Sequence, residues 1–359
     1  MHETDSQEDS TLTPTLPAAA GQRTYAIFRN ADFKRYLIAR FVAALGMQMM
    51  VTALDWELYK RAHSGLALGF VGLSLMVPMI LCTLPAGQLA DRRNRKSIIL
   101  GSTLVLAFAS LGLTLTSAFI ALDQNIATFQ FFAYSMLVVI GMARTFLWPA
   151  SAAFVTALVT RADLPRAITF NSGAFQLSCV LGPSAAGVII WLTHGAWLVY
   201  AVNVVFGIAA LALIAGIRHE HKIPPREPTS LKSLITGFHF VYQNKIILGT
   251  ITLDMFAVLL GGAVTLLPIF AEEIIPLHNG AEGVGLGLLR AAIPIGAIFC
   301  VFFIAHRPPL QKAGRTMLLC VAIFGAATIL FGLANRLCLG GYFPAANGVW
   351  FWVAFGLLA

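Results

Sequence analysis

Long apolar runs separated by short polar turns are the feature that most restricts how this chain folds. Runs 66–90 and 97–120 each exceed the roughly 20 residues that a helix needs to cross a bilayer core. The turn between them carries a cluster of basic residues: Arg92, Arg93, Arg95 and Lys96. A short basic turn between two membrane-length runs is typical of a cytoplasmic hairpin loop. We therefore expect an all-α polytopic membrane protein.

Composition excludes a soluble fold and several functions. Of the 359 residues, 58% are apolar and only 11% are charged, whereas a soluble domain carries about 25% charged residues. The net charge of +8 is spread over short loops, which fits membrane topology and not a nucleic-acid footprint. The five cysteines form no CxxC pair and there is no phosphate-binding loop, so we expect no metal, no cofactor and no enzymatic activity. The expected partners are the lipid bilayer and a small-molecule substrate, with a monomeric chain.

The apolar runs divide into two blocks. The predicted spans are 36–58, 66–90, 97–120, 128–149, 167–192, 196–217, 246–270, 283–305, 316–333 and 343–359. We expect a disordered cytoplasmic tail (1–29), a six-helix bundle (30–217), a cytoplasmic linker with an interfacial helix (218–245) and an incomplete four-helix bundle (246–359). We also expect 152–165 to be a cytoplasmic connection with a short surface helix. Two blocks joined by a basic linker are typical of secondary transporters built from parallel repeats.

The loop charges predict the orientation of the chain. External loops in this scheme hold only Lys60, Arg61 and Arg336, and all other loop cations fall on the opposite side. Because basic loops stay in the cytoplasm, the N-terminus is expected to be cytoplasmic.

Apart from Asp55 and Glu57 at the external end of the first span, four charges fall inside predicted spans: Arg40, Arg144, Asp254 and Arg290. A charge at mid-membrane costs roughly 2.5–3.5 kcal/mol on insertion scales, so each is a candidate site for coupling to protons or substrate. Arg144 either faces a central cavity, where it pairs with substrate or influences a proton site, or forms a structural ion pair. Asp254 is expected to face protein, as a proton acceptor or as the fixed partner of Arg290 or Arg40. Arg40 either faces the cavity or extends to the cytoplasmic surface.

Two further predictions concern helix faces. Asp55 and Glu57 are expected to be solvated at the external end of the first span. In the fifth span, Ser178, Gly182 and Ala186 recur every four residues, with Pro183 and Gly187 beside them. Small residues at this spacing let another helix approach closely, and the proline bends the helix.

The basic turn also carries a specific motif: Gly87, Asp91, Arg92, Arg95 and Lys96. This spacing resembles the loop between the second and third helices of the major facilitator superfamily, except that Asn94 stands where the family usually has glycine. We expect Asp91 to accept hydrogen bonds from backbone N–H groups at the start of the third span and to pair with Arg95. The resemblance implies that this loop acts as a cytoplasmic latch between two bundles.

A wider resemblance covers almost the whole chain. Its carriers are 64–69, 90–92, 163–166, 171–172, 181–183 and 266–268. These segments are similar to the enterobactin-exporter-like branch, the transmembrane secretion effectors. The resemblance implies a proton-coupled exporter of siderophore- or drug-like molecules in the bacterial inner membrane, working by alternating access and driven by the proton gradient.

The superfamily has twelve spans, whereas this chain has ten predicted spans and ends at Ala359 within an apolar run. The sequence leaves a truncated product or an atypical ten-span protein open. It therefore also leaves open a non-transporting accessory subunit.

Overall fold

A computed structural model describes residues 25–119, 126–218, 239–260, 262–274, 282–305 and 313–338, together with Gly356. Every regular element in these ranges is helical, as the sequence predicts. Residues 1–24 of the predicted tail, most of the linker, the loop at 306–312 and, apart from Gly356, the tenth span lie outside the described residues. The last five residues of the predicted disordered tail, 25–29, form a short helix, so the expectation of disorder is wrong for them.

The helices form two groups. The first bundle consists of α2 (Ala31–Ala62), α3 (Gly65–Arg92), α4 (Arg95–Phe119), α5 (Ile126–Leu158), α6 (Leu164–Thr193) and α7 (Trp197–Ala215), preceded by the short helix η1 (Tyr25–Arg29). The second bundle consists of α9 (Lys245–Leu260), η3 (Gly262–Leu266), α10 (Leu267–Ile269), η4 (Phe270–Ile274), α11 (Glu282–Ala305) and α12 (Ala313–Cys338). Eight of these helices are long and apolar enough to cross a membrane.

Local sequence explains where α2 begins. Asn30 adopts an extended backbone, and its side-chain Oδ1 accepts from the backbone N–H groups of Asp32 at 3.0 Å and Phe33 at 3.2 Å. An Asn in this position satisfies N–H groups that have no partner within the helix. The polar lead-in is therefore the first turn of the spanning helix.

Two predicted boundaries are wrong. The helix of the fourth span, α5, continues beyond its predicted end at residue 149 and ends at Leu158. The short surface helix predicted within 152–165 is therefore not a separate element. The seventh span is broken, because α9 ends at Leu260 and a 3-10 turn, a short α turn and a π turn follow. Pro268 lacks an N–H group and the adjacent glycines weaken helix propensity, which accounts for the break.

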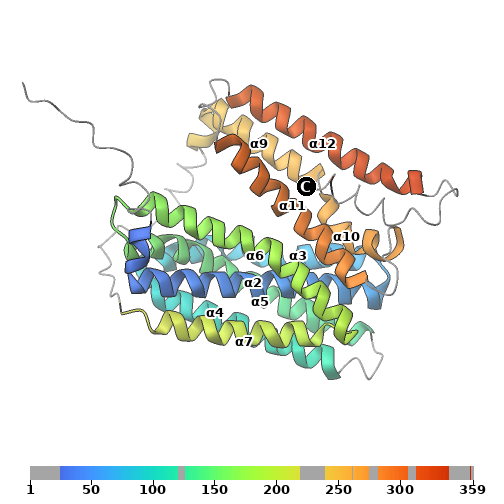
Figure 1. The fold of residues 1–359 in the computed structure, drawn as a ribbon, viewed down its shortest axis with the longest axis horizontal. Helices are drawn as coiled ribbons and strands as arrows, with labels where there is room; N and C mark the ends of the chain where they lie inside the picture. The colour runs from blue at the N-terminus through green and yellow to red at the C-terminus, as the bar shows by residue number, and fades with distance from the viewer. Residues whose placement is uncertain are drawn as a thin grey trace, which may run out of the picture.

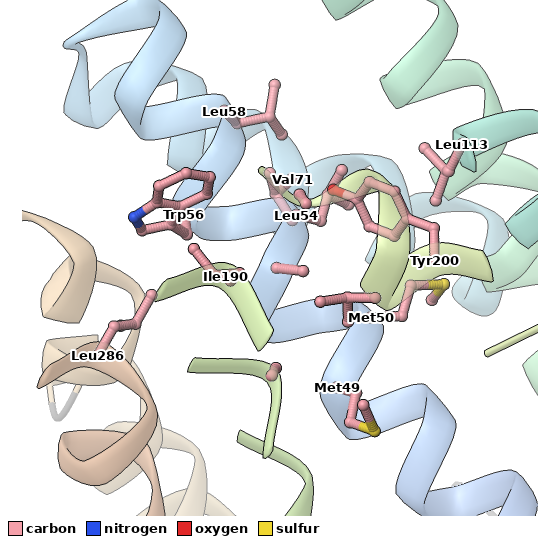
Figure 2. Packing of buried hydrophobic residues seen from close by; sticks show 14 of the residues in the cluster. Met49, Met50, Leu54, Trp56, Leu58, Val71, Leu113, Ile190, Tyr200 and Leu286 are labelled. Atoms are coloured by element: carbon pink, nitrogen blue, oxygen red, sulfur yellow. The ribbon is translucent and has the colours of Figure 1, made fainter. Parts of the chain in front are cut away.

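The two ends of the molecule are packed differently. One buried cluster joins both bundles, since it contains Met50 and Ile190 from the first and Leu286, Leu289 and Phe331 from the second. Figure 2 shows Leu286 of α11 beside Ile190 of α6 and Trp56 of α2. The other cluster, which contains Phe33, Tyr36 and Phe154, is built from first-bundle residues alone.

The second bundle therefore meets the first at one end only. Figure 1 shows α11 meeting α6 near the C-terminal end of α6 and diverging from the first bundle toward the end where α2 begins. At that far end, Ile298 is 44% exposed and Phe299 is 71% exposed on α11. We call the packed end the junction and the other end the open end.

Candidate functional site

A hollow in the first bundle brings together two of the predicted site residues. It measures about 200 Å³ and its lining includes Arg40, Gln48, Arg144, Trp148, Phe175 and Asn203. We call it the arginine cavity. A neighbouring cleft of about 390 Å³ shares Arg40, Trp148 and Phe175 with it and adds Asn171 and Gln176. Arg40 and Arg144 therefore line one cavity, which is formed by residues of α2, α4, α5, α6 and α7.

The two arginines have no carboxylate partner among the described residues. Neither Arg40 nor Arg144 takes part in an ion pair there, and the buried Nε of Arg40 has no hydrogen-bond partner. The two charges repel each other, because Arg40 lies within Coulombic range of Arg144. The Arg144 guanidinium carbon lies 5.9 Å from the centre of the Trp148 ring, a weak cation–π contact. A structural ion pair at Arg144, one of the two predicted alternatives, is thus absent from the described part of the chain.

Arg290 has a carboxylate partner, and that partner belongs to the other bundle. Its Nη2 donates to Asp55 on α2, and its Nη1 donates to Thr52 at 3.2 Å. Asp55 is only 7% exposed, so the prediction that it is solvated is wrong. The alternative in which Asp254 is the fixed partner of Arg290 is therefore wrong. This ion pair ties the bundles together at the junction.

Sequence reasoning missed Asp55, although a signal for it exists. Gln48, Thr52 and Asp55 follow one another at helical spacing, so they form a polar stripe along one face of α2. Gln48 and Thr52 line a junction cleft of about 380 Å³ together with Arg290, Gln176 and Pro183. Gln48 also lines the arginine cavity, so the arginine cavity and the junction cleft are neighbours along α2.

Glu57 is also buried, at 4% exposure, and its role is structural. Its carboxylate accepts from Arg61 at 2.6 Å, Ser117 at 2.7 Å and Tyr200 at 2.9 Å. These bonds join α2, α4 and α7 within the first bundle. Glu57 also lines a hollow of about 560 Å³ whose lining residues all belong to the first bundle.

The small residues of α6 serve two neighbours. Ser178 donates to the backbone oxygen of Phe41 at 3.2 Å, and a Cβ at Gly182 would lie 2.6 Å from Gln48 Cβ, so these positions face α2. A Cβ at Gly187 would collide with the backbone of Gly283 on α11. Pro183 approaches α11 in the same way, because its backbone oxygen would collide with a Cβ at Gly287. Ala186 is fully buried in the cluster that spans both bundles. The predicted close helix approach is present in the structure.

The basic loop braces the first bundle. Arg95 donates to the backbone oxygen of Ala153 at 3.0 Å, and Lys96 donates to the carbonyls of Ala215 and Ile217 at 2.9 and 2.6 Å. Lys96 thereby satisfies backbone carbonyls at and just beyond the end of α7. A Cβ at Gly87 would meet no neighbour within 4 Å among the described residues.

The expectation that Asp91 starts the third span is wrong. α3 continues through Arg92, so Asp91 lies in its last turn, and the side chains of Asp91 and Arg92 lie outside the described residues. Asn94 has the capping role instead, since its Oδ1 accepts from the N–H of Lys96 at 3.0 Å. The departure from the family's glycine therefore supplies a helix cap.

Asp254 does not face protein in the described structure. Its side chain is exposed on α9. The polar side chains that line the junction cleft come from α2, α6 and α11.

Comparison with known proteins agrees with this architecture. The family model described as "Transmembrane secretion effector" matches residues 22–345. The chain belongs to the transmembrane secretion effectors. This is a family of the major facilitator superfamily, so the chain is a multi-pass membrane transporter and not an enzyme.

Similar curated proteins are named enterobactin exporters. The chain is 25% identical over 318 residues to enterobactin exporter EntS of Shigella flexneri, covering 86% of this chain and 71% of the relative. It is 25% identical over 360 residues to EntS of Citrobacter koseri, covering 89% of this chain and 80% of the relative.

Solved transporter structures share the fold of this transmembrane secretion effector. A peptide transporter POT in complex with sulfate matches with a TM-score of 0.61 at 14% identity, over 91% of this chain and 78% of that chain. A D-xylose–proton symporter matches with a TM-score of 0.56 at 14% identity, over 91% of this chain and 80% of that chain. These likenesses confirm the predicted fold class.

Proposed function

We propose that this chain is a proton-coupled exporter of a small organic molecule, siderophore- or drug-like, that works by alternating access. It acts as a monomer in the bacterial inner membrane, with its N-terminus in the cytoplasm. The observation that carries the proposal is the contrast between two neighbouring hollows: Arg40 and Arg144 line one of them without a carboxylate partner among the described residues, and Arg290, which is paired with Asp55, lines the other at the junction.

The position of the arginine cavity supports export. If the N-terminus is cytoplasmic, the open end faces the cytoplasm and the junction faces outward. A molecule entering from the cytoplasm reaches the arginine cavity without crossing the junction. Release on the other side requires the bundles to separate at the junction and to close at the open end, which is the rocking motion of transporters built from two repeats.

The ion pair supports coupling to protons. Opening the junction separates Asp55 from Arg290, and the attraction between opposite charges in a weakly polar interior opposes that separation. A proton on Asp55 neutralises the carboxylate and removes most of that attraction. Among the described residues, Arg290 on α11 is bound to Asp55 and Tyr200 on α7 lies within Coulombic range of it, while Glu57, two residues further along α2, is bound to Arg61. Asp55 thus replaces Asp254 as the proposed proton-linked carboxylate.

Reconstitution tests the proposal. The full chain is placed in liposomes with an imposed pH gradient, and uptake of catecholate and drug-like probes is followed together with internal pH. We expect uptake that stops when a protonophore dissipates the gradient and that is lost in Asp55→Asn. Uptake that is unchanged by the protonophore and by Asp55→Asn would refute proton coupling through this carboxylate. Asp254→Asn is the matched control and is expected to transport normally.

A further inference from the structure

We infer that the arginine cavity binds an organic anion with a flat aromatic body, so that the transported molecule carries at least one negative charge beside a ring. The inference rests on the proposed export function, because it names the chemical class of the ligand. Arg40 and Arg144 bind the anionic group, and Trp148 with Phe175 contacts the ring.

The charges of the cavity carry the first step. Two arginine side chains line one hollow of about 200 Å³, and its lining contains no aspartate or glutamate. Cations inside a membrane protein are normally paired with carboxylates or carbonyls, yet the described residues provide no ion pair for either arginine. Arg290, which joins the two bundles at the junction, does have a carboxylate partner, Asp55. The missing negative charge at Arg40 and Arg144 is therefore assigned to a ligand.

The geometry of the donors carries the second step. Arg40 lies on α2 and Arg144 on α5, so the two guanidinium groups reach the cavity from different helices. The buried Nε of Arg40 has no acceptor in the described structure. An arginine fork binds a planar carboxylate or a pair of adjacent oxygens through two parallel hydrogen bonds. An anionic group of this shape would satisfy the Arg40 donor that the described part of the protein leaves unsatisfied.

The aromatic side chains carry the third step. Trp148 is 50% exposed, lines both the arginine cavity and the adjoining cleft, and has the Arg144 guanidinium 5.9 Å from its ring centre. Phe175 of α6 lines the same two hollows. A flat ring stacks on such side chains while its charged group reaches the arginines. An inorganic anion would contact the arginines but not the aromatic rings. Contact with the rings therefore distinguishes an aromatic organic anion from an inorganic one.

Binding to matched probes tests the inference. The full chain in nanodiscs of zwitterionic lipid is titrated by calorimetry, in low-chloride buffer, with 1-naphthoate, 1-naphthamide and inorganic phosphate. The first two probes share a ring system and differ in charge, and phosphate has charge without a ring. We expect naphthoate to bind at least tenfold more tightly than either of the others. Equal affinity for the amide, or tighter binding of phosphate, would overturn the inference.

Variants assign the binding to the cavity. Arg144→Gln and Arg40→Gln are each expected to weaken naphthoate binding at least tenfold, and Arg144→Lys is expected to retain more affinity than Arg144→Gln because the charge remains. The control is Arg166→Gln, since Arg166 pairs with Asp163 at the surface at 3.2 Å. Elution volume and thermal unfolding verify that each variant is folded. Unchanged naphthoate affinity in folded Arg144→Gln would overturn the inference.

The assays separate this inference from the proposed function. Naphthoate binding that depends on Arg144, without any flux in liposomes, would support the anion site and refute the exporter. Proton-driven flux of neutral or cationic molecules that is unaffected by Arg144→Gln would support the exporter and overturn the anion site.

Discussion

Two arginine sites in this molecule differ in what surrounds them. Arg290 at the junction has a carboxylate, a threonine hydroxyl and close helix packing around it. Arg40 and Arg144 in the arginine cavity have no carboxylate among the described residues and line open space. All three arginines lie in apolar helices that are long enough to cross a membrane. The bilayer around the helices therefore does not explain why only Arg290 among them has a carboxylate partner in the described structure.

The difference separates closing a contact from receiving a ligand. A cation with a fixed partner stabilises one arrangement of the two bundles, and it resists any motion that separates the pair. A cation without one has a free energy that falls when an anion arrives. The junction therefore sets the conformation, and the cavity provides a place for a ligand to bind.

Asp55→Asn breaks the junction site and is expected to have the largest effect. Removing one member of a buried ion pair leaves the other charge uncompensated and typically costs about 3–5 kcal/mol. We expect a loss of this size in the free energy of unfolding, measured by denaturant titration in detergent micelles. Asp163→Asn removes the carboxylate of a surface pair and should change it by less than about 1 kcal/mol. Similar losses in both variants would show that the junction pair is no stronger than a surface pair.

Gly187→Ala tests the close approach of the bundles. The added Cβ collides with the backbone of Gly283, which has no side chain to move aside. Overpacking of this kind costs about 1–3 kcal/mol, and we expect the bundles to be displaced at the junction. Distances between spin labels on α6 and α11 would report the displacement.

Gly173→Ala is the control for that variant. Gly173 lies on the same helix, and a Cβ there would meet no neighbour within 4 Å among the described residues. The label distances should therefore stay at the values of the unsubstituted chain. An unchanged distance in Gly187→Ala as well would mean that the junction has room for a methyl group.

The sequence predicted the fold better than the partners of its charges. Apolar run length and loop charge depend on local composition, so α2 to α7 begin and end within a few residues of their predicted bounds, except for the end of α5. The sequence does not predict the break after Leu260, because glycines and a proline also occur inside continuous membrane-spanning helices. Whether they interrupt a helix depends on how the neighbouring helices pack.

Ion-pair partners depend on which helices meet, and hydropathy does not contain that information. Arg290 was recognised as a candidate, but Asp55 was assigned to the solvated end of its span because it lies near a loop. Asp55 is buried because α11 contacts α2 at this position and brings Arg290 against it. The prediction of close helix packing on α6 is confirmed, because the small residues themselves determine where a neighbouring helix can approach.

Asn94→Ala tests a bond at the open end that involves only the first bundle. Removing the side chain that accepts from Lys96 N–H costs about 1 kcal/mol of helix stability. Asn94→Gly should cost only a few tenths of a kcal/mol, because glycine is tolerated at this position. The unfolding temperature should be highest for the unsubstituted protein, slightly lower for Asn94→Gly and lowest for Asn94→Ala. Equal unfolding temperatures for alanine and glycine would show that the cap is not the source of the effect.

Arg144→Gln is expected to have the smallest effect on stability, and its sign sharpens the comparison most. An arginine in a structural ion pair destabilises the protein when it is removed, as Asp55→Asn should at the junction. Arg144 has Arg40 as a neighbouring charge and no carboxylate in the described structure, so its removal relieves repulsion and forfeits only a weak contact with Trp148. We expect the free energy of unfolding, measured without ligand, to stay within about 1 kcal/mol or to rise, because such cation–π contacts are worth about 0.5–1 kcal/mol at exposed sites. Arg290→Gln is the matched variant and should lose several times more. A loss as large as that of Arg290→Gln would mean that Arg144 has a structural partner, and the unpaired cavity would then be no different from the junction.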